Sequence, residues 1–181
     1  VTLLVFDSDD NMASVTRHIR YTDYERPQFS LLQPLYFSSV DQVVLADRLA
    51  AIDVVDGDIS NRIRVSTLSN TDNSEIYDIS IQVTNSMGDT SRLRLPVVIQ
   101  PTNPLRPVIT LSSHLVYVDA GSEFDPASYV TAVTASQTSV DVSQVSISND
   151  VNTATAGTYR VVYTYSANGS TGTAILTVVV Q

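Results

Sequence analysis

Residues 77–83 read YDISIQV, and residues 159–165 read YRVVYTY. In both stretches apolar or aromatic residues occupy every second position, which is the period of a strand that buries one face. A turn follows each of them, NSMG at 85–88 and ANG at 167–169. Because Gly, and often Asn, accepts a positive φ, these turns predict that each strand returns as a β-hairpin.

The returning strands and the upstream residues repeat as well. Alternating apolar residues run from Leu93 to Ile99 in the first copy and from Ala174 to Val180 in the second. Upstream, RPQFSL at 26–31 reappears as RPVITL at 106–111. Turn signals such as DGD at 56–58 recur often enough to predict about seven short strands in each repeat. The expected fold is therefore all-β, with each repeat a β-sandwich.

The chain starts with a third copy of the hairpin pattern. Apolar residues alternate from Val1 to Val5, turn-forming residues follow at 7–11, and a second strand returns over 15–21. Because an isolated two-stranded hairpin is marginal in water, we expect its apolar face to be covered by the repeat that follows or by a second chain.

These copies divide the chain into three parts. We expect residues 1–24 to be the terminal hairpin of a preceding repeat, called here the N-terminal hairpin. Residues 25–103 form the first repeat, and residues 104–181 form the second repeat. The joint between the repeats reads PTNP at 101–104. Since proline fixes φ, this joint is semi-rigid, and we expect the two repeats to sit end to end.

Composition agrees with a β fold and excludes several functions. Val, Ile and Thr make up 56 of the 181 residues, and β-branched side chains favour strands. Without Cys or Lys, the chain forms no disulfide, thiolate nucleophile or lysine Schiff base. Its net charge of −9 argues against nucleic acid as a partner. It also lacks the long apolar run that membrane insertion requires.

Several motifs together resemble a known family. The first repeat carries AIDVVDGDIS at 51–60, a strand beginning at Tyr77, and MGD at 87–89. The second carries VDAGSEFDP at 118–126 and AGTY at 156–159. This order resembles the bacterial immunoglobulin-like, or cadherin-like, surface repeats that occur in tandem on Gram-positive surface proteins and some pesticidal crystal proteins.

The resemblance covers residues 25–181, and the N-terminal hairpin looks like part of a third member. It implies tandem Ig-like β-sandwiches on the bacterial cell surface, outside the cell. It also implies a non-catalytic spacer or stalk, whose partners are the neighbouring Ig-like repeats of the parent chain. Two alternatives remain open: an adhesin module for a host glycan or protein, and an accessory domain of a secreted polysaccharide-degrading enzyme.

Three carboxylates form the candidate metal site, namely Asp53, Asp56 and Asp58. They lie within six residues of one another, and oxygen ligands of this kind suit Ca²⁺. The preferred interpretation is a tight turn in which Gly57 supplies the unusual φ and the aspartates accept backbone N–H groups. No cofactor is otherwise expected.

The second repeat bears on this choice. Aligned on Ala51 and Ala132, the three aspartates correspond to Thr134, Gln137 and Ser139. A related sandwich without these carboxylates favours the turn over the metal.

The other candidate groups are sparse. Residues 7–11, DSDDN, resemble part of a calcium loop, but Met12 and His18 stand where an EF-hand needs Gly and Glu, so a hairpin turn is preferred. His18 and His114 are the only histidines. Neither lies in a catalytic motif, and we expect no enzymatic activity.

The nine tyrosines invite a sugar-binding interpretation, but four of them fall on the expected core face. These are Tyr77, Tyr159, Tyr163 and Tyr165. Tyr36, together with Tyr21 and Tyr24, lies near the first joint and is expected to serve a contact between domains.

Overall fold

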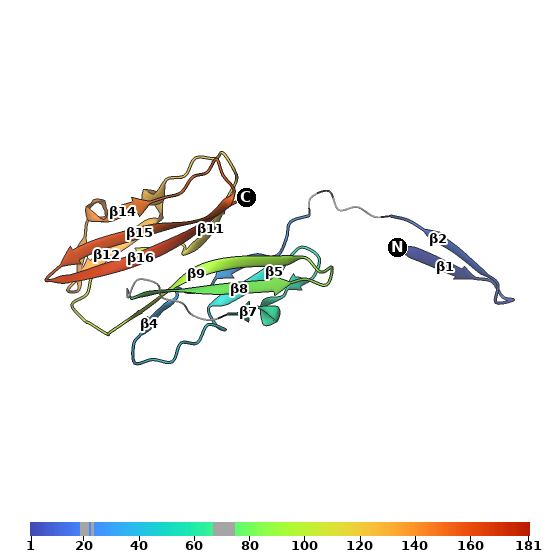
Figure 1. Cartoon of the computed structure of the whole chain (residues 1–181), viewed down its shortest axis with the longest axis horizontal. Helices are drawn as coiled ribbons and strands as arrows, with labels where there is room; N and C mark the ends of the chain where they lie inside the picture. The colour runs from blue at the N-terminus through green and yellow to red at the C-terminus, as the bar shows by residue number, and fades with distance from the viewer. Residues whose placement is uncertain (19–21, 23, 67–74) are drawn as a thin grey trace.

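The computed structural model describes residues 1–18, 22, 24–66 and 75–181. Its regular structure is almost entirely β, interrupted by three short 3₁₀ helices (Figure 1). These are η1 (Ser60–Arg62), η2 (Pro126–Tyr129) and η3 (Val142–Gln144). The all-β prediction with Ig-like sandwiches is confirmed.

The first repeat contains two facing sheets. One has the strand order β3-β5-β6 and the other β4-β9-β8-β7. The bounds are β3 (Gln28–Leu31), β4 (Tyr36–Ser38), β5 (Leu49–Asp53), β6 (Gly57–Asp58), β7 (Arg64–Val65), β8 (Ile76–Thr84) and β9 (Thr90–Gln100). β8 and β9 form the expected hairpin, while β4 pairs with β9 in parallel.

The second repeat has the same topology. Its sheets are ordered β10-β12-β13 and β11-β16-β15-β14, with β11 parallel to β16. The bounds are β10 (Val108–Leu111), β11 (Leu115–Val118), β12 (Val130–Ala135), β13 (Thr138–Val140), β14 (Ser146–Asn149), β15 (Gly157–Ala167) and β16 (Ser170–Val180). The turn between β15 and β16 has positive φ at both Asn168 and Gly169, as a two-residue hairpin requires.

Strict alternation along the long hairpins builds each core. The inward residues of β8 and β9 are buried: Ile79, Ile81, Val83, Leu93, Leu95 and Val97. The tyrosines assigned to the core lie there too, with Tyr163 fully buried and Tyr77, Tyr159 and Tyr165 packed against a core. Burying each large apolar side chain contributes about 1.5–3 kcal/mol, so these hairpins stabilise most of each sandwich.

The prediction that the two repeats sit end to end is wrong. The second repeat turns back at the joint and lies alongside the first (Figure 1). Contacts run between β16 and β9 and between β11 and β3. The reason is apolar burial at the side of the sandwich, because Leu115 of β11 is buried in the core of the first repeat.

The N-terminal hairpin is formed by β1 (Thr2–Phe6) and β2 (Met12–Thr16). It stands apart from both repeats (Figure 1), and Val5 and Phe6 are 66% and 61% exposed. Of the two covers expected for its apolar face, the first repeat does not provide one, and cover by a second chain stays a prediction. β1 and β2 form a two-stranded sheet of ten residues. No other sheet of the described residues packs against it.

Candidate functional site

Asp53, the first residue of the candidate metal site, closes a loop. It ends β5 and is buried. One carboxylate oxygen accepts the N–H groups of Val55 and Asp56, each at 2.9 Å, and the other accepts the side-chain amide of Asn85 at 3.1 Å. Burial alone would raise the pKa of Asp53, but these hydrogen bonds hold it below its usual value. The carboxylate thus ties the β5–β6 turn to the β8–β9 turn.

The other two aspartates have their own donors. Asp56 accepts the N–H and hydroxyl of Ser86 at 2.8 and 2.6 Å and pairs with Arg62. Asp58 accepts the N–H and hydroxyl of Ser60. The pKa of each carboxyl is lowered, chiefly by its serine hydroxyl.

This arrangement is that of a turn stabilised by side chains. Gly57 has a φ of +71°, the left-handed conformation that glycine adopts without strain. Among the described residues, no group of three or more His, Asp or Glu side chains is placed to hold a metal ion. Ca²⁺ at these three aspartates stays a hypothesis, for which every carboxylate would have to exchange its present donors.

The structure shifts the alignment of the repeats by one residue. Ala51 faces Phe29 across the sheet, and the residue that faces Ile109 in the second repeat is Val133 rather than Ala132. Asp53 therefore corresponds to Ala135. The loop that follows Ala135 is shorter, because Ala135 pairs with Thr138. Single-residue register errors are invisible to alignment by residue type when both neighbours are small and apolar.

The other candidates from the sequence, the turn at residues 7–11 and the two histidines, lie in surroundings that do not form a metal or catalytic site. Asp7 accepts the N–H groups of Asp9 and Asn11 at 2.9 Å and the Asn11 amide at 2.9 Å, which closes the hairpin turn. His18 is exposed. His114 lies edge-on to the Tyr36 ring, with the centroids 5.6 Å apart, and its Nδ1 lies 3.1 Å from the Ile175 carbonyl.

The junction between the repeats is built from two tyrosines. The Tyr36 hydroxyl, on β4, accepts the N–H of Ile175 on β16 at 2.7 Å. The Tyr117 hydroxyl, on β11, accepts the N–H of Phe29 on β3 at 2.8 Å. Burial raises the pKa of Tyr36 to about 12. Each repeat therefore inserts one phenol into the other. Tyr36 makes a contact between domains, but with the second repeat rather than at the first joint, where it was expected. Tyr24 instead accepts from Asn85 of the first repeat, and Tyr21 lies outside the described residues.

Sequence reasoning missed Tyr117, although a signal existed. Tyr36 pairs with Val98 on β9, and Tyr117 pairs with Val179 on β16. The two tyrosines thus occupy the same position of the repeat, on the short parallel strand. Each of these strands is too short for its alternation of apolar residues to be recognised in the sequence. The equivalence of Tyr36 and Tyr117 is therefore seen only from the strand pairing in the structure.

Polar contacts extend the junction on either side. Arg160 of β15 pairs with Asp78 of β8 at 2.5 Å. Asn103, in the joint, donates to the Ser170 hydroxyl at 3.0 Å. Within the described part of the chain, no helix is long and apolar enough to cross a bilayer.

Comparison with known proteins shows that the second repeat is similar to a known family. Residues 110–180 match the family described as bacterial surface protein, Ig-like domain, which confirms the resemblance seen in the sequence. An uncharacterized 81.3 kDa protein of Acholeplasma phage L2 is 29% identical over 169 residues, covering 90% of this chain. The chain spans only 22% of the length of that relative.

Solved structures with a related arrangement are distant. The M60 catalytic domain with CBM51-1 and CBM51-2 from Clostridium perfringens ZmpB is 10% identical, with a TM-score of 0.36 over 99% of this chain and 33% of that one. Drosophila N-cadherin EC1-4 is 12% identical, with a TM-score of 0.32 over 87% of this chain and 50% of that one. Likenesses this weak have no bearing on the role of the chain.

Proposed function

We propose that this chain is a non-catalytic spacer module of a bacterial cell-surface protein, located outside the cell, that sets a fixed geometry between its neighbours in the parent chain. The family match of residues 110–180 supports the surface location. The observation that carries the proposal is the exchange of Tyr36 and Tyr117 between the repeats. Two sandwiches joined this way move as one body. The module therefore fixes the relative orientation of its neighbours and adds more to the width of the parent protein than to its length.

The surroundings of the histidines support a role without catalysis. His114 contacts a tyrosine ring and a backbone carbonyl, and neither is a nucleophile or an orienting carboxylate. A screen against esterase, protease and glycosidase substrates is expected to give background rates. Turnover that disappears on substitution of His18 or His114 would contradict this part of the proposal.

Spin-label distances test the fixed geometry directly. The chain has no Cys, so Asn61→Cys and Ser146→Cys, at exposed sites of the first and second repeats, can be labelled without background. One narrow distance distribution is expected between them. Its width should equal that of a control pair within the first repeat, Asn61→Cys with Met87→Cys. A distribution much broader than the control would mean that the repeats move independently, and the spacer proposal would fail.

A further inference from the structure

Three arginines stand together on the outer face of the first repeat. Across the sheet Arg64 of β7 lies opposite Gln82 of β8, and Gln82 lies opposite Arg92 of β9. Arg94 follows two residues later, opposite Ser80. Opposed residues of antiparallel strands point to the same face, so the three guanidinium groups share one surface, called here the arginine face.

Within the part of the chain that the structure describes, these cations have no carboxylate partner. The ion pairs among the described residues use Arg62, Arg106 and Arg160. Arg64, Arg92 and Arg94 are exposed and form none. In a chain of net charge −9, three unpaired guanidinium groups on one face make a local cationic site.

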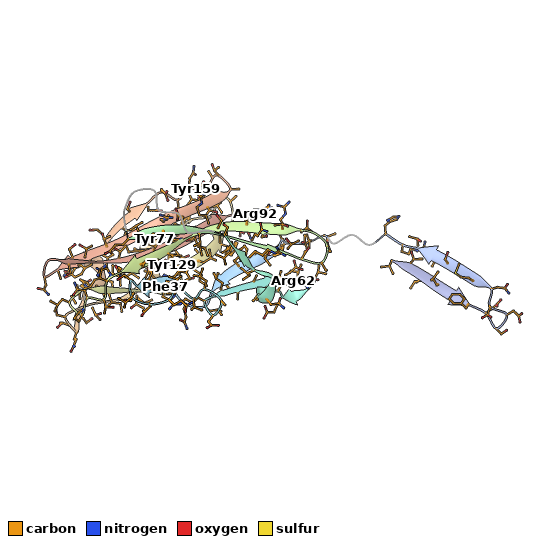
Figure 2. The ribbon with its side chains drawn as sticks, turned by 60° about the horizontal axis from the view of Figure 1, so that its bottom comes forward. Phe37, Arg62, Tyr77, Arg92, Tyr129 and Tyr159 are labelled. Carbon is orange, nitrogen blue, oxygen red and sulfur yellow. The ribbon has the colours of Figure 1, made fainter. Side chains whose placement is uncertain are left out.

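The arginine face is hollowed. A cavity of about 410 Å³ is lined by the three arginines together with Ser66, Ser80, Gln82 and, from the second repeat, Thr158. A second hollow of about 430 Å³ adjoins it and shares Arg94 and Thr158. The two hollows form one groove, with its floor on β8 and β9 and one wall on β15. Figure 2 shows Arg92 and Tyr159, one from each repeat, on the same side of the molecule.

One polar group beside the second hollow is left without a partner. Thr177 lines the second hollow and is 2% exposed, yet its hydroxyl has no hydrogen-bond partner. Buried hydroxyls in folded proteins almost always have one. Beside it, Asp78 and Asp150 line the same hollow, so negative charge marks where the cationic part of the groove ends.

We propose that this groove binds an acidic glycan, whose carboxylate or sulfate groups are held by Arg64, Arg92 and Arg94. Guanidinium groups bind carboxylates and tetrahedral oxyanions by paired hydrogen bonds. Ser66, Ser80, Gln82 and Thr158 supply the amide and hydroxyl groups that sugar hydroxyls need. The described residues lining the first hollow, where the three arginines lie, include no aromatic ring. In that hollow a neutral sugar has nothing to stack on, so charge must supply the recognition there. This role goes beyond the proposed spacer function and does not depend on it.

The test is a titration followed by amide chemical shifts in NMR, with four probes of similar length. Hexagalacturonate carries carboxylates, a heparin hexasaccharide carries sulfates, maltohexaose is neutral, and hexaglutamate is an acidic peptide. One or both acidic sugars are expected to shift amides of β7, β8 and β9 at low salt. The identity of the binding sugar then distinguishes carboxylate from sulfate as the ligand. Maltohexaose should produce no shifts. High salt should weaken the binding of the acidic sugars, because exposed charges are screened.

Matched variants locate the site. Arg92→Ala should weaken binding roughly threefold and Arg92→Ala with Arg94→Ala roughly tenfold. Arg17→Ala, which removes the same charge from the N-terminal hairpin, should leave affinity unchanged. Replacing exposed arginines should also leave the melting temperature of each variant unchanged.

Three results would overturn the proposal. One is the absence of binding by either acidic sugar. Another is equal weakening by the Arg17 control, which would indicate a general charge effect. The third is binding of hexaglutamate as tight as that of the sugars, which would identify the groove as a site for acidic peptides.

Discussion

Asp53 gives the first repeat a buried carboxylate that the second repeat replaces with Ala135. Its oxygens accept two N–H groups of its own turn and the amide of Asn85. The residue therefore connects two loops at one end of the sandwich. The second repeat manages with a shorter loop, which needs no such acceptor.

Asp53→Ala is expected to lower the free energy of unfolding by about 2 kcal/mol or more, because it leaves three donors in a buried site without an acceptor. Asp58→Ala removes only contacts to Ser60 at the surface and should have a much smaller effect. Urea unfolding followed by circular dichroism measures both. Adding Ca²⁺ should not raise the melting temperature of the wild type. A rise that Asp53→Ala abolishes would establish the metal site after all.

His114 makes the stability of the fold depend on pH in a range above that in which the aspartates titrate. Burial lowers its pKa below the usual 6.5, although the hydrogen bond to Ile175 opposes this. The folded state therefore favours the neutral ring, and the unfolded state binds the proton more readily. This contribution to stability is complete above about pH 6.5 and declines as the pH falls from there toward the folded pKa.

Replacing the ring tests this dependence. His114→Gln should flatten the melting temperature between about pH 5 and pH 7 relative to the wild type. The aspartates do not interfere, because their pKa values lie below 3.8 and they lose their contribution only at lower pH. Parallel curves for the two proteins would show that His114 is protonated as easily in the folded state as in the unfolded one.

At the scale of elements, the alternation of apolar residues predicted the strands of each hairpin. It did not predict which part of the molecule covers the apolar face of a hairpin. The period of two located β8, β9, β15 and β16, because each buries one face in its own sandwich. The same period in β1 and β2 indicates only that a face is suited to burial. Nothing in a local pattern identifies the covering partner, which is set by residues far away in sequence.

We propose that the N-terminal hairpin is the last two strands of another sandwich. In both full repeats the equivalent hairpin is flanked by an edge strand and by a parallel strand, β7 and β4 in the first and β14 and β11 in the second. Among the described residues, the N-terminal hairpin has neither, and its large apolar residues are exposed. A complete sandwich of this topology would contain both strands.

Deleting residues 1–22 should leave the melting temperature of the two repeats unchanged, because the hairpin buries none of its described apolar residues against them. The cut retains Tyr24, whose hydroxyl accepts from Asn85. Binding of the dye ANS should fall, since the deletion removes exposed apolar surface. A lower melting temperature, or a smaller oligomer after truncation, would show that the hairpin is covered in solution.

At the scale of the whole molecule, the junction is where prediction from the sequence was weakest. Proline in the joint predicts limited freedom, but a joint of four residues can turn back as readily as it can run straight. The direction is decided by Leu115, which fills the core of the first repeat, and by the two tyrosines. These residues look like ordinary members of short strands until both sandwiches are assembled.

Tyr36→Phe with Tyr117→Phe should loosen the junction without unfolding either sandwich. Each change leaves one backbone N–H without its acceptor, at a cost of about 1 kcal/mol. The spin-label distance between the repeats should broaden while both repeats keep their cooperative unfolding. A control, Tyr165→Phe, removes a hydroxyl from a tyrosine that packs against the second core and keeps the hydrogen bonds of Tyr36 and Tyr117. If the double variant keeps the narrow wild-type distribution, apolar contact alone fixes the geometry.

The return of the second repeat along the first also determines how the molecule responds to tension. Glu25, where the first repeat begins, and Gln181, where the second ends, border the same hollow. A pull transmitted through these two residues acts on neighbouring points, so it separates the repeats like the arms of a hinge at residues 101–104. The contact of Tyr117 with Phe29 would break first and that of Tyr36, close to the joint, last. The module can therefore lengthen at low force while both sandwiches stay folded, and the recovered contacts would draw it back when the load is removed.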